Sequence, residues 1–543
     1  MSHSKIFSGD LPELIYEVIK YFRNDFSTLY SCILVNRLWC RLAIPLLWED
    51  PFSIPTKNYK FIYVYLHNLN DDLKTKLNEY EINFNLLHSN TLFNYPSFIK
   101  YLNTCKIISS IEKWSEDDVG TLKSKNRNSH LVSDFRRLIQ MSLFKTFNEN
   151  EVKLHTLDFE IFNFESYNSY YDDIIEFILD NPTFIHNVKN LKLYIGLSSG
   201  FSYLNTSFGF SYCHTTGNKY TLQIKDRILQ IVKLQQNLKK IFLSFNSLPL
   251  YQPLLLSKGS NCSNTLNTII FYYVNFKSTI NLDKVFEQLN VLESIHIVYC
   301  FSLNTAFIQQ IINLTKPFKL KSLFINEGSQ IDESLQLLLQ KSGNYLENFG
   351  FGYGSDLFLR QQILKSVIEY SKNIKYLEIF EVGNQIDYLI FDLIESIKQN
   401  LNYLSITAIK ASRLCDNSSI ILQNLGRVLP NKLEYLSLTL NANINDFRLF
   451  LDSSNAFIKK LLIKSTMRNK IDEMLPYVKD YLVKKKRVKY LAIKETFFLS
   501  FLEDNKELFY LNDIVQEFAL NNVIVRRYND LSIYICQFIS KLH

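Results

Sequence analysis

Glycine and proline are both scarce in this sequence. Only 14 of the 543 residues are glycine and 11 are proline. The glycine share is about 2.6%, whereas roughly 7% is usual. Because tight turns depend on these two residues, the composition argues against an all-β sandwich, a glycine-rich phosphate-binding loop and a collagen-like segment.

Long apolar runs and paired cysteines are also lacking. No run of about eighteen apolar residues occurs, and residues 1–13 lack a basic stretch followed by an apolar one, so we expect neither a membrane span nor a secretion signal. The eight cysteines are scattered, with no Cys-x-x-Cys pair and no histidine at zinc-ligand spacing. This pattern predicts reduced thiols in an intracellular protein, cytoplasmic or nuclear, without a metal site.

Charge and length restrict the class of protein further. The net charge is +7, from 60 basic and 53 acidic residues, and so small an excess does not favour a nucleic-acid partner. Apolar residues make up 47% of the chain, which is enough for a folded core and excludes wholesale disorder. A chain of 543 residues exceeds what one core usually organises, so we expect several domains or a repeat array.

The first fifty residues carry the most specific local pattern. Asp10 is placed to cap a helix, with Pro12 in its first turn and Glu13 three residues after the cap. Apolar residues then recur at helical spacing, and we expect the helix to bury this face: Leu11, Leu14, Ile15, Val18, Ile19 and Phe22. Two more short helices are predicted, one through Leu29 and Cys32 and one from Arg37. Three short helices cannot bury all of these side chains, so part of the surface is expected to await a partner.

These residues resemble the F-box. The resemblance rests on Leu11-Pro12-x-Leu14-Ile15, on Leu29 and Cys32, and on Val35-Asn36-Arg37-x-Trp39, over about 40 residues. It implies docking on the Skp-type adaptor of cullin-based ubiquitin ligases. By this resemblance, the residues that contact the adaptor or hold the helices that do are Leu11, Pro12, Leu14, Ile15, Val18, Leu29, Val35 and Trp39. The alternative interpretation is a three-helix cap for the rest of the chain.

A short phrase recurs through the remainder of the chain: apolar, two variable, apolar, one variable, apolar. With 47% apolar residues the phrase alone is weak evidence, but ten copies from Leu238 to Val488 lie 25 to 32 residues apart. Two earlier copies begin at Leu154 and Val188, and helical patterns such as 307–314, 363–370 and 474–482 separate the later ones. One strand and one helix per unit are typical of a leucine-rich-repeat solenoid, whose units have about 20 to 29 residues.

The predicted fold class is therefore α/β, an amino-terminal three-helix F-box followed by a solenoid with parallel strands on its concave face and helices on its convex face. We assign residues 8–50 to the F-box-like domain, 51–153 to a mostly helical connector and cap, and 154–543 to about twelve repeat units. A long loop is expected at 196–223, where glycines and aromatics are interleaved.

Strand alternation predicts which side chains of each unit point outward, namely those two, four and six residues after each anchor. A tyrosine ladder and a group of lysines result, and the hypothesis is that they contact an acidic or partly aromatic protein segment: Tyr376, Phe380, Tyr403, Tyr435, Lys460 and Lys464. The alternative is that stacked side chains only stabilise neighbouring strands. The basic run 484–487 is either a solvated helix end or a nuclear-import patch.

No catalytic serine elbow, Walker loop or metal motif is present in the sequence. We therefore expect a non-catalytic protein without a cofactor. The F-box resemblance implies the substrate-recognition subunit of an SCF-type (Skp, cullin, F-box) ubiquitin ligase, whose repeats bind an unknown target protein. Two alternatives stay open. One is a solenoid scaffold acting outside ubiquitin transfer, and the other is an enzyme whose residues come together from distant units.

Overall fold

The structure is a computed structural model of the whole chain. It describes residues 11–542 except 24, 55–57, 68, 70, 79, 81–90, 119–128, 163–164, 198–218, 246–261, 278, 327–328, 353–356, 381–385, 409–417, 441–442, 466–469, 486–487 and 497–505. Two compact units are present, unit 1 (residues 1–267 and 289–291) and unit 2 (residues 268–288 and 292–543).

Unit 1 begins with three short helices, α2 (Pro12–Lys20), α3 (Phe26–Ile33) and α4 (Arg37–Leu47). Side-chain caps start two of them: Asp25 Oδ1 accepts from the Thr28 amide, and Asn36 Oδ1 accepts from the Trp39 amide. Helix α2 has Leu11 at its N-cap position and no side-chain cap. The prediction that Asp10 caps this helix is therefore wrong. Pro12 takes the first helical position, where its missing amide hydrogen costs nothing.

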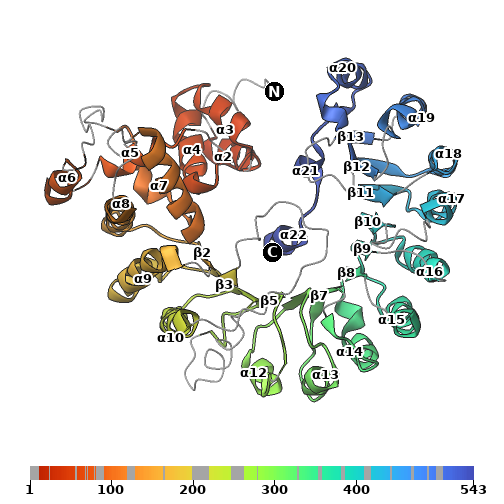
Figure 1. Ribbon diagram of the computed structural model, residues 1–543, viewed down its shortest axis with the longest axis horizontal. Coiled ribbons are helices and arrows are strands. Elements are labelled where there is room, and N and C mark those ends of the chain that lie inside the picture. Colours follow the sequence, from red (N-terminus) through yellow and green to blue (C-terminus); the bar gives the residue numbers. More distant parts are fainter. Residues whose placement is uncertain are drawn as a thin grey trace. The chain divides into compact units, whose positions relative to one another are not determined.

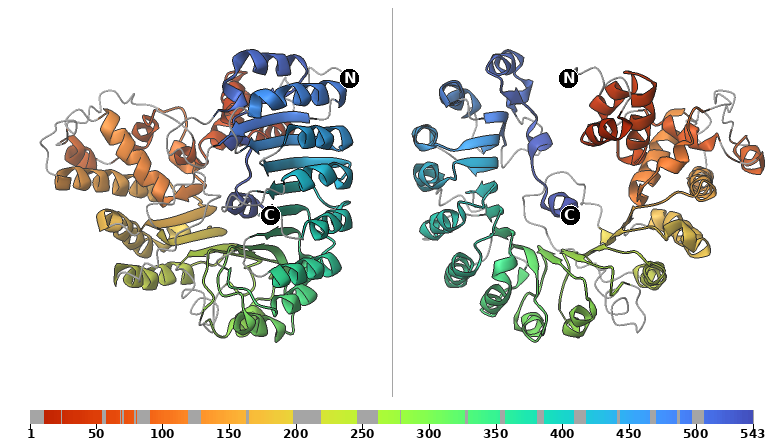
Figure 2. Two further views of the ribbon diagram at one scale, coloured as in Figure 1. Left: turned by 45° about the vertical axis from the view of Figure 1, so that its right-hand side comes forward. Right: turned by 180° about the vertical axis from the view of Figure 1, so that it is seen from behind.

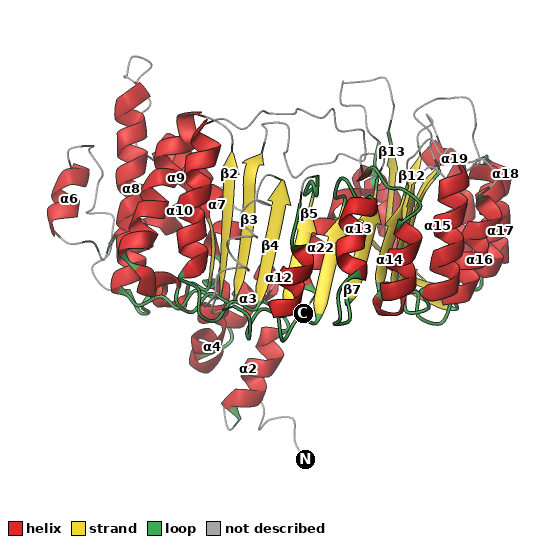
Figure 3. Cartoon of the chain, turned by 90° about the horizontal axis from the view of Figure 1, so that it is seen from below, coloured by secondary structure: helices red, strands yellow, loops and turns green. Residues whose placement is uncertain are grey.

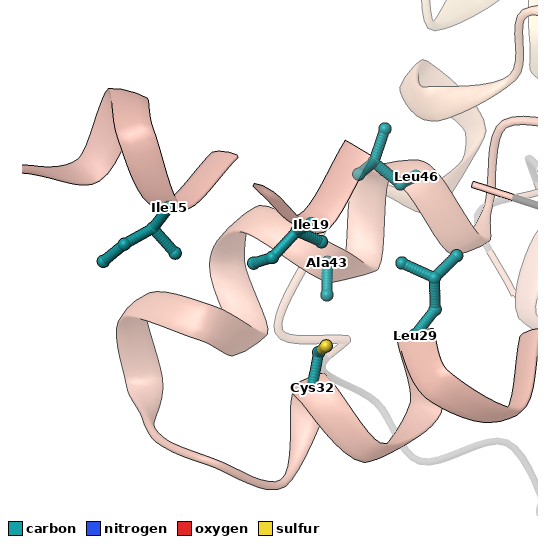
Figure 4. Packing of buried hydrophobic residues seen from close by; sticks show 6 residues of the cluster. All are labelled: Ile15, Ile19, Leu29, Cys32, Ala43 and Leu46. Atoms are coloured by element: carbon teal, nitrogen blue, oxygen red, sulfur yellow. The ribbon is translucent and has the colours of Figure 1, made fainter. Parts of the chain in front are cut away.

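The core of these helices is small (Figure 4). Its buried members come from all three helices: Ile15, Ile19, Leu29, Cys32, Ala43 and Leu46. The apolar face of α2 is buried only in part, since Ile15 and Ile19 lie inside while Leu11, Leu14 and Val18 are exposed. The prediction that α2 buries its whole face is wrong. The expectation that three helices leave apolar surface uncovered is confirmed.

The rest of unit 1 alternates helices with four parallel strands in chain order. Its elements are η1 (Pro51–Ser53), α5 (Phe61–Leu66), α6 (Asp71–Asn78), η3 (Tyr95–Phe98), β1 (Tyr101–Asn103), α7 (Thr104–Asp118), α8 (Ser129–Glu149), β2 (Thr156–Phe162), α9 (Glu165–Asp180), η5 (Pro182–Ile185), β3 (Asn190–Leu197), α10 (Lys219–Lys233) and β4 (Lys240–Phe245). Buried Glu49, just after α4, pairs with Arg23 and Lys100, and its carbonyl accepts from the Tyr101 amide. The helices are thereby tied to β1.

Unit 2 continues the same alternation with ten parallel strands. These are β5 (Thr268–Tyr272), β6 (Ser294–Val298), β7 (Leu320–Ile325), β8 (Asn348–Phe351), β9 (Tyr376–Phe380), β10 (Tyr403–Thr407), β11 (Lys432–Leu440), β12 (Phe457–Ser465), β13 (Val488–Glu495) and β14 (Ile524–Val525). The helices are α12 (Leu282–Gln288), α13 (Thr305–Ile312), α14 (Leu335–Ser342), η8 (Gly343–Tyr345), α15 (Leu357–Tyr370), α16 (Asp387–Ile397), α17 (Ser418–Val428), α18 (Ile444–Ser453), α19 (Lys470–Lys485), η9 (Leu508–Tyr510), α20 (Asn512–Leu520), α21 (Tyr528–Leu531) and α22 (Ile535–Lys541).

The α/β fold class and its repeat are confirmed, because each of the twelve predicted phrases overlaps one of the strands β2 to β13. Figure 3 shows the strands in yellow alternating with the helices in red. Two strands were not predicted: β1, within the residues expected to form a connector, and β14. Of the expected loop at 196–223, residues 198–218 lie outside the described part, while its two ends belong to β3 and α10.

In unit 2, helices α13 to α19 lie along one face of the strands, and α22 lies beside the other (Figures 1 and 2). We call this second face, formed by the outward-pointing residues of β6 to β13, the inner face. Among the residues that the structure describes, no helix is both long and apolar enough to cross a lipid bilayer. Of the basic run 484–487, the first two residues end α19 and the last two lie outside the description.

Candidate protein-interaction surfaces

The first candidate surface is on α2. Leu11, Leu14 and Val18 recur at three- and four-residue spacing, and each is between 44% and 53% exposed. Pro12, half-buried, fixes the first turn from which they project. Side chains at this spacing share one side of a helix. Apolar side chains gathered on one helix side and left uncovered are typical of a surface that binds another protein.

A second exposed apolar pair follows α3. Leu34 and Val35 are 71% and 56% exposed and lie directly before Asn36, the residue that caps α4. Trp39 is partly buried and packs against the core of the three helices, where Leu29 is fully buried. Of the eight residues predicted from the F-box resemblance, Ile15 and Leu29 therefore hold the helices together, whereas Leu11, Leu14, Val18 and Val35 are open to a partner.

The inner face brings the predicted tyrosines and lysines into register. Tyr376, Tyr403, Tyr435 and Lys460 are direct neighbours on β9 to β12. Phe380 lies four residues after Tyr376 on β9, and Lys464 lies four residues after Lys460 on β12. The two pair in register with Thr407 and Thr439 of the strands between them. The three tyrosines contact Phe538 or Leu531 and so lie on the face that strand alternation predicted. Their contact with a target protein stays a prediction.

A segment of the same chain covers the tyrosines. Tyr376 is 1% exposed and Tyr435 is 3% exposed. The ring of Phe538, on α22, lies 5.0 Å from that of Tyr376 and 5.4 Å from that of Tyr403, measured between centroids. Leu531 packs in one cluster with Tyr435, Leu462 and Ala492. The ladder predicted as a free binding surface is thus occupied by residues of the chain's own carboxy-terminal segment.

A buried carboxyl lies beside the ladder. Glu378 on β9 is 8% exposed and accepts a hydrogen bond from Tyr299 Oη, 3.1 Å from its Oε2. Burial raises the pKa of Glu378 to about 8, since desolvation penalises the charged form, and the Tyr299 hydrogen bond offsets only part of this effect. The carboxyl is therefore mostly protonated in the folded protein near neutral pH.

The basic end of the inner face is also partly buried. Burial, and then the charge of Lys494, lower the pKa of Lys464. Lys494 itself pairs with Glu507, Nζ to Oε1 at 3.0 Å, and the same carboxylate accepts from the Tyr528 amide. Lys464 is thus partly buried, and the charge of Lys494 is paired within the chain.

One serine and one histidine meet on the inner face. His296 Nδ1 and Ser322 Oγ are 2.7 Å apart on β6 and β7, a distance that would suit a nucleophile and its base. Both residues are fully buried, however, and Asn348 Nδ2 also donates to Ser322 Oγ at 3.0 Å. A substrate has no access to this hydroxyl. The pair satisfies buried polar groups between strands, as Thr268 and Ser294 do at 2.9 Å.

Gly350 on β8 shows why the few glycines of the array matter. A Cβ at this position would lie 2.1 Å from Cδ1 of Phe324, a fully buried ring on β7. We expect Gly350→Ala to lower the free energy of unfolding by about 1 to 3 kcal/mol through overpacking. Urea unfolding measures this. In a Phe324→Leu background the same substitution is expected to cost less, and an equal cost in both backgrounds would show that the ring is not the cause.

Sequence reasoning missed several residues of the inner face. Glu378 stood at a predicted outward position, but the sequence did not reveal its hydrogen bond from Tyr299, the residue just after β6, three strands earlier. Leu531 and Phe538 lie after the last repeat phrase, where no periodic signal marks them. Neither a scan against protein-family models nor a search of curated proteins finds a match to this chain.

Proposed function

We propose that this chain is the substrate-recognition subunit of an SCF-type ubiquitin ligase. The observation that carries the proposal is a packed three-helix module whose own core leaves Leu14, Val18 and Val35 exposed. The F-box resemblance supplies the partner, a Skp-type adaptor. The repeat array that follows is a surface suited to holding a target protein.

The mechanism is proximity rather than bond chemistry by this chain. A subunit that holds an adaptor at one end and a target along its repeats raises the effective concentration of the target's lysines near the charged conjugating enzyme. The exposed side chains on α2 and after α3 favour an α-helical or groove-like adaptor surface, because apolar residues spaced by three and four positions fit such surfaces.

The test is direct binding of the purified full-length chain to a purified Skp-type adaptor. We expect a stoichiometric complex, measured by size-exclusion chromatography and calorimetry, and recovery of a cullin when the complex is captured from cells of an organism that has this machinery. A wild-type chain that binds no adaptor would refute the ligase function and leave the interaction scaffold.

A further inference from the structure

The carboxy-terminal segment has the features of a ligand seated on the inner face. After β14 the chain forms α21, of four residues, and α22, of seven. Helices this short are not stable by themselves in water. Figure 1 shows α22 beside the strands, on the side away from the outer helices. The conformation of residues 528–541 therefore depends on the surface beneath them.

The contacts of this segment are mainly apolar. Leu531 enters the cluster of Tyr435, Leu462 and Ala492, and Phe538 packs against Tyr376 and Tyr403. Leu531 and Phe538, seven residues apart, thus anchor the segment on the tyrosines of the inner face, and Ile535 and Ile539 of α22 are buried as well. Both anchors belong to unit 2, as do all the residues that they contact.

Two hydrogen bonds that join the segment to Tyr435 and Ser437 of the inner face are long. The Ile533 amide donates to Tyr435 Oη at 3.4 Å, and Ser437 Oγ and Tyr528 Oη are 3.3 Å apart. Neither pair is charged, and both lie beyond the usual hydrogen-bond distances. A third contact involves a charge, since the Tyr528 amide donates to Glu507 Oε2 at 3.2 Å. Glu507 keeps its ion pair with Lys494 when the segment leaves, so no buried charge is left unpaired. Apolar anchors with polar contacts of this kind are characteristic of a segment that a competitor can replace.

We propose that residues 528–541 are an internal ligand of the inner face, and that the target segments recognised there carry an aliphatic and an aromatic residue seven positions apart and displace it. The inference rests on the proposed function in treating the repeats as the target-binding part. Covalent linkage gives the internal segment an effective concentration of about millimolar, so a target must outcompete it. Bound target and closed segment are then mutually exclusive states.

The test uses the full-length chain and a fluorescent synthetic peptide of residues 526–543. The double variant Leu531→Asp, Phe538→Asp places a carboxylate at each anchor position. Because the surface beneath both positions is apolar, we expect the segment to leave the inner face in this variant. We expect this variant to bind the peptide at least about 10-fold more tightly than the wild type does. Gln537→Asp, at an exposed position of α22, is the matched control and should bind as the wild type does. Adding Tyr403→Ala to the released variant should abolish the gain.

Three outcomes would overturn the proposal. The peptide binds the wild type and the released variant equally, or it binds neither although the variant unfolds as cooperatively as the wild type, or the released variant loses cooperative unfolding of unit 2. The last result would identify the segment as an obligatory part of the core. None of these measurements involves an adaptor, so a failure here is distinguishable from a failure of the proposed ligase function.

Discussion

Replacing Glu378 by glutamine is expected to raise the free energy of unfolding of unit 2 at pH 8 and to flatten its dependence on pH. The folded protein holds a proton on Glu378 because burial raises the pKa from 4.5 to about 8. The unfolded chain releases this proton above about pH 4.5. Between these two values the unfolded state binds fewer protons than the folded state, so the stability of the wild type falls as the pH rises through this window.

The size of the effect follows from the same shift. About 1.4 kcal/mol per pKa unit sets an upper limit of roughly 5 kcal/mol, and we expect a gain on the order of 3 kcal/mol at pH 8 for Glu378→Gln. Glutamine does not titrate, and its amide oxygen can still accept from Tyr299 Oη. The gain should shrink towards pH 5. There the wild-type carboxyl is protonated in nearly all folded molecules, and the pH approaches the value at which the carboxyl of the unfolded chain also takes up a proton.

The measurement has an internal control, because all three tryptophans lie in unit 1 and unit 2 has none. Tryptophan fluorescence follows the unfolding of unit 1, and hydrogen exchange of the β9 to β11 amides follows unit 2. Only the second should respond to Glu378→Gln, and the exposed substitution Glu333→Gln should alter neither. A variant that is no more stable than the wild type at pH 8 would contradict a buried, protonated Glu378.

The repeat was predictable from the sequence because its signal is local and periodic. In each unit the second and third apolar residues of the phrase face the helices, and a right-handed crossover limits the distance to the next strand, so the phrase returns every 25 to 32 residues. Strand β1, with three residues, and β14, with two, are too short to carry the phrase. Their pairing depends on the neighbouring strand rather than on their own sequence.

The state of the inner face was not predictable in the same way. Alternation placed Tyr376, Tyr403 and Tyr435 correctly in register, yet it could not reveal that Leu531 and Phe538 cover them. Contacts between residues nearly 100 or more positions apart leave no periodic trace in one sequence. The amino-terminal helices show the converse: the pattern located all three, but which side of α2 is buried depends on how α3 and α4 pack against it.

The exposed residues of α2 and the turn after α3 give the proposed adaptor contact a second, quantitative test. The double variant Leu14→Asp, Val35→Asp is expected to bind a purified Skp-type adaptor at least about 100-fold more weakly than the wild type, because two central apolar contacts are each worth about 2 kcal/mol or more in such interfaces. Both side chains are more than half exposed, so the fold of the three helices should survive. An aspartate at position 14 also lies in the first turn of α2, where the helix dipole favours negative charge.

Leu520→Asp on α20 is the matched control, since Leu520 is equally apolar, 85% exposed and located in unit 2. It should leave adaptor binding unchanged, whereas substitution of the buried Leu29 by alanine should weaken binding and lower the unfolding temperature together. Calorimetry gives the affinities, and tryptophan fluorescence, which includes Trp39 beside the core, reports whether the helices remain folded. If the Leu14, Val35 double variant binds within about threefold of the wild type, these exposed side chains are not hot spots of the contact. The adaptor, if bound, must then be held elsewhere on the chain.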